Sequence, residues 1–197
     1  MSQTTATTAI EHETYSSTGL DSRKLGMWFF LVTEVMLFSA LIGALLNARM
    51  RSPADANDVL NIPITGVNTF ILIISSFTVV MALQAAQDGK QGQLRFFLLA
   101  TLALGATFLG VQVFEYRELL HEGFTPSTNP FSGAFFTTTG LHGFHVFIGL
   151  LLILWLLPQA FRGRFGPANT MRVEVFGLYW HFVDIVWIML FTIVYLL

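Results

Sequence analysis

Apolar residues gather along this chain in five long stretches, separated by shorter polar segments that contain glycine or proline. A helix needs roughly 20 apolar residues to cross about 30 Å of hydrocarbon, and each stretch is long enough. None alternates apolar and polar residues as the strands of a membrane barrel do. The pattern therefore predicts an all-α, polytopic membrane bundle of five transmembrane helices, at residues 25–46, 66–86, 94–116, 133–157 and 175–197.

Composition supports this class. Of the 197 residues, 54% are hydrophobic and only 11% are charged, and the mean hydropathy is +0.65. Soluble domains carry about 25% charged residues, so the bilayer is the natural solvent for this chain. The absence of cysteine excludes disulfides, thiolate metal sites and cysteine nucleophiles. The net charge of −2 gives no indication of nucleic-acid binding. Residues 1–22 are polar, so we expect an N-terminal tail before a transmembrane domain at 23–197.

The basic residues predict an orientation. With five spans, the N-terminus and the second and fourth loops lie on one side of the membrane. That side carries seven of the ten basic residues: Arg23, Lys24, Lys90, Arg95, Arg162, Arg164 and Arg172. The other side carries Arg49, Arg51 and Arg117. The positive-inside rule then places the N-terminus in the cytoplasm, or the matrix, and the C-terminus outside.

Two glutamates stand out within the predicted spans, because an ionisable side chain costs roughly 2.5–3.5 kcal/mol at the centre of a membrane helix. Glu34 lies nine residues into the first span and has no cation near it in the sequence. It is either a protonatable carboxyl near a proton-carrying partner or a neutral carboxyl hydrogen-bonded between helices. Glu115 lies near the outer end of the third span, where we expect it to be solvated or paired with Arg117.

Two further pairs of polar residues lie three positions apart, and so on one face of a helix. His142 and His145 in the fourth span could ligate a metal or haem iron, although the more economical interpretation is hydrogen bonding between helices. His181 and Asp184 in the fifth span resemble part of a catalytic triad, but no nucleophile accompanies them. We expect these two to form a self-contained polar pair within the bundle.

Several segments resemble subunit III of the haem-copper respiratory oxidases. Residues 177–187 (GLYWHFVDIVW) are similar to the final helix of that family, and residues 138–149 (TTGLHGFHVFIG) to the helix before it. Residues 30–38 (FLVTEVMLF) resemble the segment that carries the family's buried carboxylate. Matches at 68–69, 75–78 and 112–116 extend the likeness to the helices between. It covers roughly residues 23–197 in order and is most similar to the five-helix bacterial form.

The resemblance implies a non-catalytic subunit of a proton-pumping terminal oxidase in the bacterial cytoplasmic membrane. Such a subunit holds no cofactor itself, since the haem and copper belong to subunits I and II. It packs directly on subunit I, holds phospholipids there and supports proton uptake and stability during turnover. The resemblance also implies that Glu34 is the family's buried carboxylate and Glu115 its third-helix carboxylate. His142, His145, His181 and Asp184 then occupy its intramembrane polar positions.

Other functions remain as alternatives. The electron donor to the complex is expected to be cytochrome c, with quinol as the alternative, and a homologue associated with nitric oxide reductase shares the same fold. Seven-helix relatives have two further N-terminal helices that form one wall of a lipid-holding cleft, and the five-helix form lacks them. A small proton-coupled transporter using Glu34, Glu115, His181 and Asp184 is a rival of a different class, but the spans show no internal repeat. A dihaem protein using His142, His145 and His181 is a second rival.

Overall fold

The computed structural model describes residues 21–51 and 62–196, and these form five long helices. The helices are α2 (Ser22–Arg51), α3 (Ile62–Gln87), α4 (Gln91–His121), α5 (Pro130–Phe161) and α6 (Met171–Phe191), and a π-helical turn, η1 (Thr192–Leu196), follows α6. All five are long and apolar enough to cross a membrane, which confirms the predicted all-α membrane bundle. The predicted N-terminal tail lies almost wholly outside the described residues.

Each helix begins before the apolar stretch that predicted it, and α2 to α5 also end beyond it, because polar residues outside the hydrocarbon continue the helix. Pro158 lies one residue beyond the predicted fourth span, 133–157, but the structure places it inside α5. Proline removes one backbone donor but does not end the helix here, and α5 continues to Phe161. In the last span, α6 gives way to the π turn at Thr192.

Local signals explain why the helices end where they do. Helices α3, α4 and α5 are each followed by a glycine with positive φ, at Gly89, Gly123 and Gly163. After α5, the Gly163 amide donates to the Ala160 carbonyl at 3.1 Å and the next amide donates to Gln159 at 3.1 Å. Paired bonds of this kind are the Schellman motif, which satisfies the last carbonyls of a helix and favours glycine.

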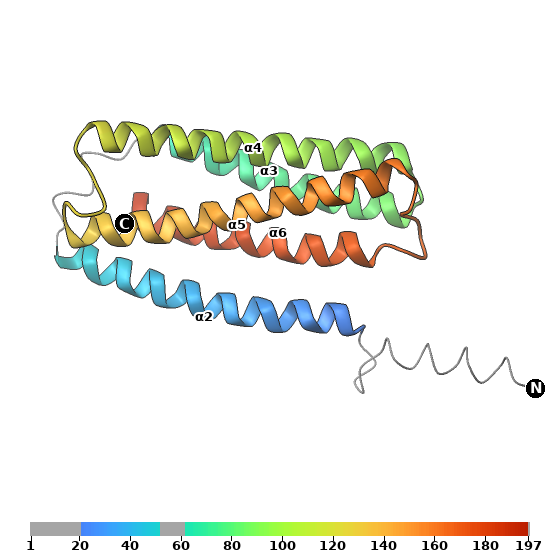
Figure 1. Cartoon of the computed structure of the whole chain (residues 1–197), viewed down its shortest axis with the longest axis horizontal. Helices are drawn as coiled ribbons and strands as arrows, with labels where there is room; N and C mark the ends of the chain where they lie inside the picture. The colour runs from blue at the N-terminus through green and yellow to red at the C-terminus, as the bar shows by residue number, and fades with distance from the viewer. Residues whose placement is uncertain (1–20, 52–61, 197) are drawn as a thin grey trace, which may run out of the picture.

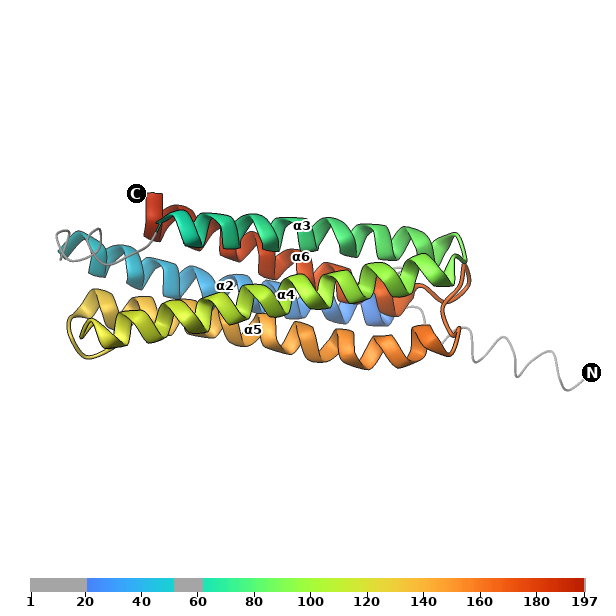
Figure 2. The same ribbon diagram turned by 90° about the horizontal axis from the view of Figure 1, so that it is seen from above.

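The bundle consists of a ring of four helices and one peripheral helix. Helices α3, α4, α5 and α6 pack in that order around a common core, with α3 also against α6. Helix α2 packs on the outside of the ring against α5 and α6 (Figures 1 and 2). Its buried side chains include Leu31, Phe38 and Leu45, which are seven residues apart, the spacing of a coiled-coil seam.

Trp180 occupies the centre of the ring. Its side chain is 1% exposed, and its indole nitrogen donates to Ser75 Oγ of α3 at 3.0 Å. The indole lies against two glycines, Gly105 of α4 and Gly149 of α5. A β-carbon at these positions would come within 2.8 Å and 2.5 Å of it. One side chain of α6 therefore contacts all three other helices of the ring, and the two glycines make this possible.

Candidate functional site

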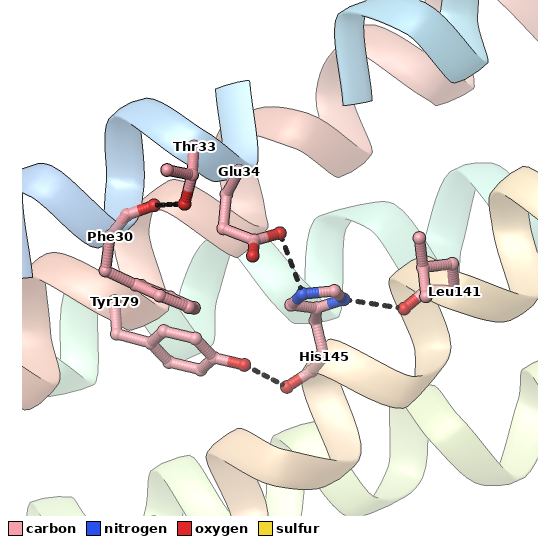
Figure 3. A network of polar contacts seen from close by, with 6 residues as sticks. All are labelled: Phe30, Thr33, Glu34, Leu141, His145 and Tyr179. Carbon is pink, nitrogen blue, oxygen red and sulfur yellow. Dashed lines mark hydrogen bonds and ion pairs between the residues drawn. The ribbon is translucent and has the colours of Figure 1, made fainter. Parts of the chain in front are cut away.

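A buried contact between a carboxyl and an imidazole joins α2 to the ring (Figure 3). Glu34 Oε2 lies 3.1 Å from His145 Nε2 of α5, and the side chains are 13% and 8% exposed. Glu34 Oε2 has no aligned hydrogen-bond partner among the described residues, so this is a close polar contact rather than a well-formed hydrogen bond. The structure therefore gives Glu34 the interhelical partner that its own sequence neighbours do not provide.

A hydrogen bond from its other ring nitrogen, Nδ1, fixes the orientation of the His145 ring. Nδ1 lies 2.8 Å from the carbonyl oxygen of Leu141, and since a carbonyl only accepts, Nδ1 is the donor. Nε2 is thereby turned towards Glu34. On α6, the hydroxyl of Tyr179 donates to the His145 carbonyl at 2.9 Å (Figure 3).

Aromatic rings surround this contact. Phe38, one turn after Glu34 on α2, meets the His145 ring edge-on at a centroid distance of 5.2 Å. Phe30, one turn before Glu34, lies 6.3 Å from the ring of Tyr179. Aromatic side chains of α2 and α6 therefore pack beside the polar pair.

His142 does not share the surroundings of His145. It is completely buried, stacks on Trp187 of α6 at 4.8 Å and meets Phe108 of α4 edge-on at 5.9 Å. Neither ring nitrogen has a hydrogen-bond partner among the described residues. The two histidines therefore point to different neighbours, and the interhelical hydrogen bonding expected of His142 is not made by a protein group.

His181 and Asp184 do not form the expected polar pair. His181 Nδ1 lies 2.6 Å from Ser76 Oγ of α3, whereas neither carboxyl oxygen of Asp184 has a hydrogen-bond partner in the described part of the chain. Asp184 is near Ser76 without meeting hydrogen-bond geometry. The prediction was wrong because a hydroxyl on the facing helix lies closer to the imidazole than the short side chain three residues away.

Glu115 also has a partner that the sequence did not indicate. The hydroxyl of Thr65 on α3 donates to Glu115 Oε1, and the described residues include no ion pair between Glu115 and Arg117. Arg117 is exposed, and the next helix is closer to the carboxyl than its own neighbour is. Glu115 therefore joins α4 to α3 in the same way that His181 joins α6 to α3.

No set of three or more histidine, cysteine, aspartate or glutamate side chains converges anywhere in residues 21–51 and 62–196. The three polar contacts between helices described above instead join two side chains each, and so connect α2 to α5, α6 to α3 and α4 to α3.

Two adjoining grooves at the end of the bundle where α5 meets α6 were not predicted. One, of about 180 Å³, is almost entirely apolar and is lined by residues of α2, α5 and α6 that include Met27, Leu152 and Phe176. The other, of about 330 Å³, is lined by Arg162, Arg164 and Arg172. Trp155 and Arg172 line both grooves, and the Arg172 guanidinium lies over the Trp155 ring at 5.6 Å. The cluster of arginines in the sequence was the signal that could have indicated this site.

Comparisons with known proteins agree with the resemblance. The family model for cytochrome c oxidase subunit III matches residues 3–197. The chain is 38% identical over 174 residues to the cytochrome bo(3) ubiquinol oxidase subunit 3 of Pseudomonas aeruginosa, covering 87% of this chain and 83% of the relative. It is also 38% identical over 177 residues to the cytochrome c oxidase subunit 3 of a Bacillus species, covering 88% and 84%. The quinol oxidase subunit 3 of Bacillus subtilis is 35% identical over 175 residues, with 88% and 86% covered. The chain therefore belongs to the cytochrome c oxidase subunit III family of the haem-copper oxidases.

Proposed function

We propose that this chain is the non-catalytic subunit III of a proton-pumping terminal oxidase, and that it packs on subunit I while subunits I and II hold the haem and copper. The observation that carries the proposal is the use of its buried polar groups. Glu34, Glu115 and His181 each contact a helix other than their own, α5 for Glu34 and α3 for the other two. Such contacts fix how helices pack in lipid, where no hydrophobic driving force acts between them. A bundle of this kind supports a catalytic subunit by holding a defined shape.

Lipid holding is the second part of the proposal, and the paired grooves support it. A phospholipid needs a cationic surface for its phosphate and an apolar channel for an acyl chain. Arg162, Arg164 and Arg172 provide the first beside the apolar groove lined by Met27 and Phe176. Trp155, which lines both, has the amphipathic character favoured at the membrane interface.

We further propose that this end of the bundle faces the cytoplasm of a bacterial cell. The seven basic residues that predicted the orientation lie at the end where α2 begins and where the turns α3–α4 and α5–α6 lie (Figure 1). Arg49, Arg51 and Arg117 lie at the opposite end, near the end of α2 and the end of α4. The positive-inside rule then assigns the basic end to the cytoplasm. Accessibility labelling of a single cysteine introduced at the exposed Gln87 or Glu122 in intact cells tests this assignment.

For the electron donor we keep cytochrome c, with quinol as the alternative. Relatives of both kinds match this chain at 38% identity, so the test is functional. The purified complex is expected to oxidise reduced cytochrome c and to leave a soluble quinol unreacted. The opposite preference would replace the donor while leaving the rest of the proposal unchanged.

Affinity purification of the chain in a mild detergent tests the accessory role directly. Haem absorbance is expected to arrive with a larger partner and to leave when a stronger detergent removes that partner. Haem retained by the chain alone would make the histidines ligands and refute the proposal. A colourless chain without partners would instead favour the transporter, which proton uptake by reconstituted vesicles would then establish.

Glu34→Ala separates support from catalysis in the assembled complex. We expect unchanged haem content and near-normal initial oxidase activity, followed by faster loss of activity during sustained turnover or weaker lipid retention. Glu34→Gln, which keeps the size of the side chain, is the matched control for packing. Complete loss of initial activity in a fully assembled Glu34→Ala complex would contradict the support role.

The lipid proposal has its own test. Arg162→Gln with Arg164→Gln changes two exposed side chains of the basic groove, and Arg117→Gln changes an exposed arginine at the other end. Mass spectrometry of lipids that co-purify with the complex is expected to show less bound anionic phospholipid in the double variant only. Equal lipid content in the wild type and both variants would remove the basic groove from the proposal.

A further inference from the structure

The inner ring of helices contains a concentration of buried polar atoms that the protein itself does not satisfy. One residue on each helix contributes: Asn68 of α3, Gln112 of α4, His142 of α5 and Asp184 of α6, all at most 4% exposed. The atoms without a hydrogen-bond partner among the described residues are the two amide oxygens, both ring nitrogens and both carboxyl oxygens. Native proteins leave few buried polar atoms unpaired, so a concentration of them requires an explanation.

A 180° flip of the Asn68 or Gln112 side-chain amide does not satisfy these atoms. Asn68 Nδ2 donates to the carbonyl of Phe108 at 3.1 Å, and Gln112 Nε2 donates to the carbonyl of Thr139 at 2.9 Å. A carbonyl only accepts, so a flipped amide would place oxygen against oxygen. The remaining amide oxygens are therefore fixed as acceptors that point away from these bonds.

Three of the four residues lie at one level of the ring. The backbone carbonyl of Phe108 accepts the hydrogen bond from Asn68. The side-chain ring of Phe108 meets the His142 ring edge-on, with the centroids 5.9 Å apart. Gln112 is one turn after Phe108 and binds Thr139, which is three residues before His142. Gln112 Oε1 lies so close to Gly143 that a β-carbon there would be 2.9 Å away. Asn68, Gln112 and His142 are therefore neighbours, through Phe108, Thr139 and Gly143, in the same part of the core.

The unpaired groups at this level include both donors and acceptors. A neutral imidazole provides one N–H donor and one bare nitrogen, and each amide has an unpaired oxygen beside a nitrogen whose second N–H is not used in the bonds above. A partner for these groups must therefore both donate and accept. Asp184, one turn before the Trp187 ring that stacks on His142, adds a carboxyl at the adjacent level.

We infer that the level of Asn68, Gln112 and His142 is a binding site for ordered water within the ring of α3–α6. Water is the smallest molecule that brings two donors and two acceptors, and buried waters typically make about three hydrogen bonds to otherwise unpaired groups. A water between His142 and the amide oxygens can donate to those oxygens and accept from the ring N–H. The site lies inside the ring, whereas the Glu34–His145 contact lies on the outside of the ring against α2.

Cryo-electron microscopy of the intact oxidase complex tests this inference, at a resolution that shows ordered waters in the other subunits. We expect density within hydrogen-bond distance of a His142 ring nitrogen and of Gln112 Oε1 or Asn68 Oδ1. A core in which these atoms pair directly with protein groups, or in which no density appears while equally buried waters are visible elsewhere, overturns it.

A variant supplies the second readout. His142→Leu removes both ring nitrogens with little change in side-chain volume, so the same density is expected to disappear or to move towards the amides. Density that persists unchanged in an assembled variant overturns the assignment of His142 to the site. If the variant does not assemble, Asn68→Leu provides the equivalent comparison from the other side of the site, and the wild-type map decides in either case.

Discussion

Replacement of Gly149 by alanine is the sharpest test of the core packing. A β-carbon at this position would lie 2.5 Å and 2.7 Å from Trp180 Cζ3 and Cε3, and 3.5 Å from Tyr179 Cε1. Carbon atoms in contact prefer about 3.5–4.0 Å, so the indole would have to move by roughly 1 Å. The indole is restrained on the other side. Its nitrogen donates to Ser75, and Cη2 packs so closely on Gly105 that a β-carbon added there would lie 2.8 Å away.

The magnitude follows from two opposing effects. Overpacking a core typically costs about 1–3 kcal/mol, and the rigid, constrained indole places this site towards the upper part of that range. Alanine also favours the helix by about 1 kcal/mol relative to glycine. We therefore expect Gly149→Ala to destabilise the bundle by about 1–2 kcal/mol in net terms. Gly110 of α4 is the matched control, because a β-carbon there meets nothing within 4 Å.

The assay is thermal inactivation of the purified complex, followed by fluorescence-detected size-exclusion chromatography. The two alanine variants are expected to differ by about 2–3 kcal/mol, with Gly110→Ala equal to or above the wild type and Gly149→Ala below it. A separation on the order of 4–12 °C corresponds to this difference for a chain of this size. The reasoning fails if Gly149→Ala is as stable as Gly110→Ala, since the indole would then not occupy the space between the glycines.

Three smaller effects are also expected. Lys24→Glu should weaken the contact of α2 with α6 by less than about 1 kcal/mol, because its ion pair with Glu174 is partly exposed, and adding Glu174→Lys should restore thermal stability. Trp187→Phe should lower stability by about 0.5–1.5 kcal/mol beyond the packing loss, because the hydrogen bond from the indole nitrogen to Thr69 Oγ1 is lost. In a double-mutant cycle, the Thr69→Val background should remove this hydrogen-bond contribution to the effect of Trp187→Phe. Ser76→Ala should alter the NMR chemical shift of the labelled His181 ring, and an unchanged shift would contradict the contact in the structure.

The fold could be predicted almost completely from the sequence, because membrane helices are specified by length and hydropathy alone. The five spans are found in the right order, and the turn glycines Gly89, Gly123 and Gly163 mark three helix ends. The ends were predicted too short because hydropathy measures only the part in hydrocarbon, while backbone hydrogen bonding continues into the polar flanks. The fourth span was predicted to end before Pro158, but α5 continues past it, because one missing donor is tolerated near the end of a helix.

The polar contacts could be predicted only in part. Periodicity within a helix shows which residues share a face, but it does not show which residue of another helix faces them. His181 and Asp184 share a face and still do not pair, because Ser76 of α3 is closer to the ring. Glu34 and His145 could have been paired from depth, since they lie nine and twelve residues from the same membrane side in the predicted spans. The choice between His145 and His142 needed the packing of α2, which the sequence does not contain.

Helix α2 illustrates how a membrane protein attaches a peripheral element. Its seam of Leu31, Phe38 and Leu45 fits α5 and α6, but lipid tails are as apolar as these side chains and compete with that contact. Polar contacts have no such competitor in the hydrocarbon, and α2 makes them at three heights. Lys24 binds Glu174 at one end, Glu34 meets His145 near the middle, and Arg49 donates to the carbonyls of Ile193 and Val194 at the other end. A sliding or rotation of α2 would break all three contacts together, so they fix its register. Of the three, only the contact at Glu34 lies within the membrane, where no water is available to replace the lost partner.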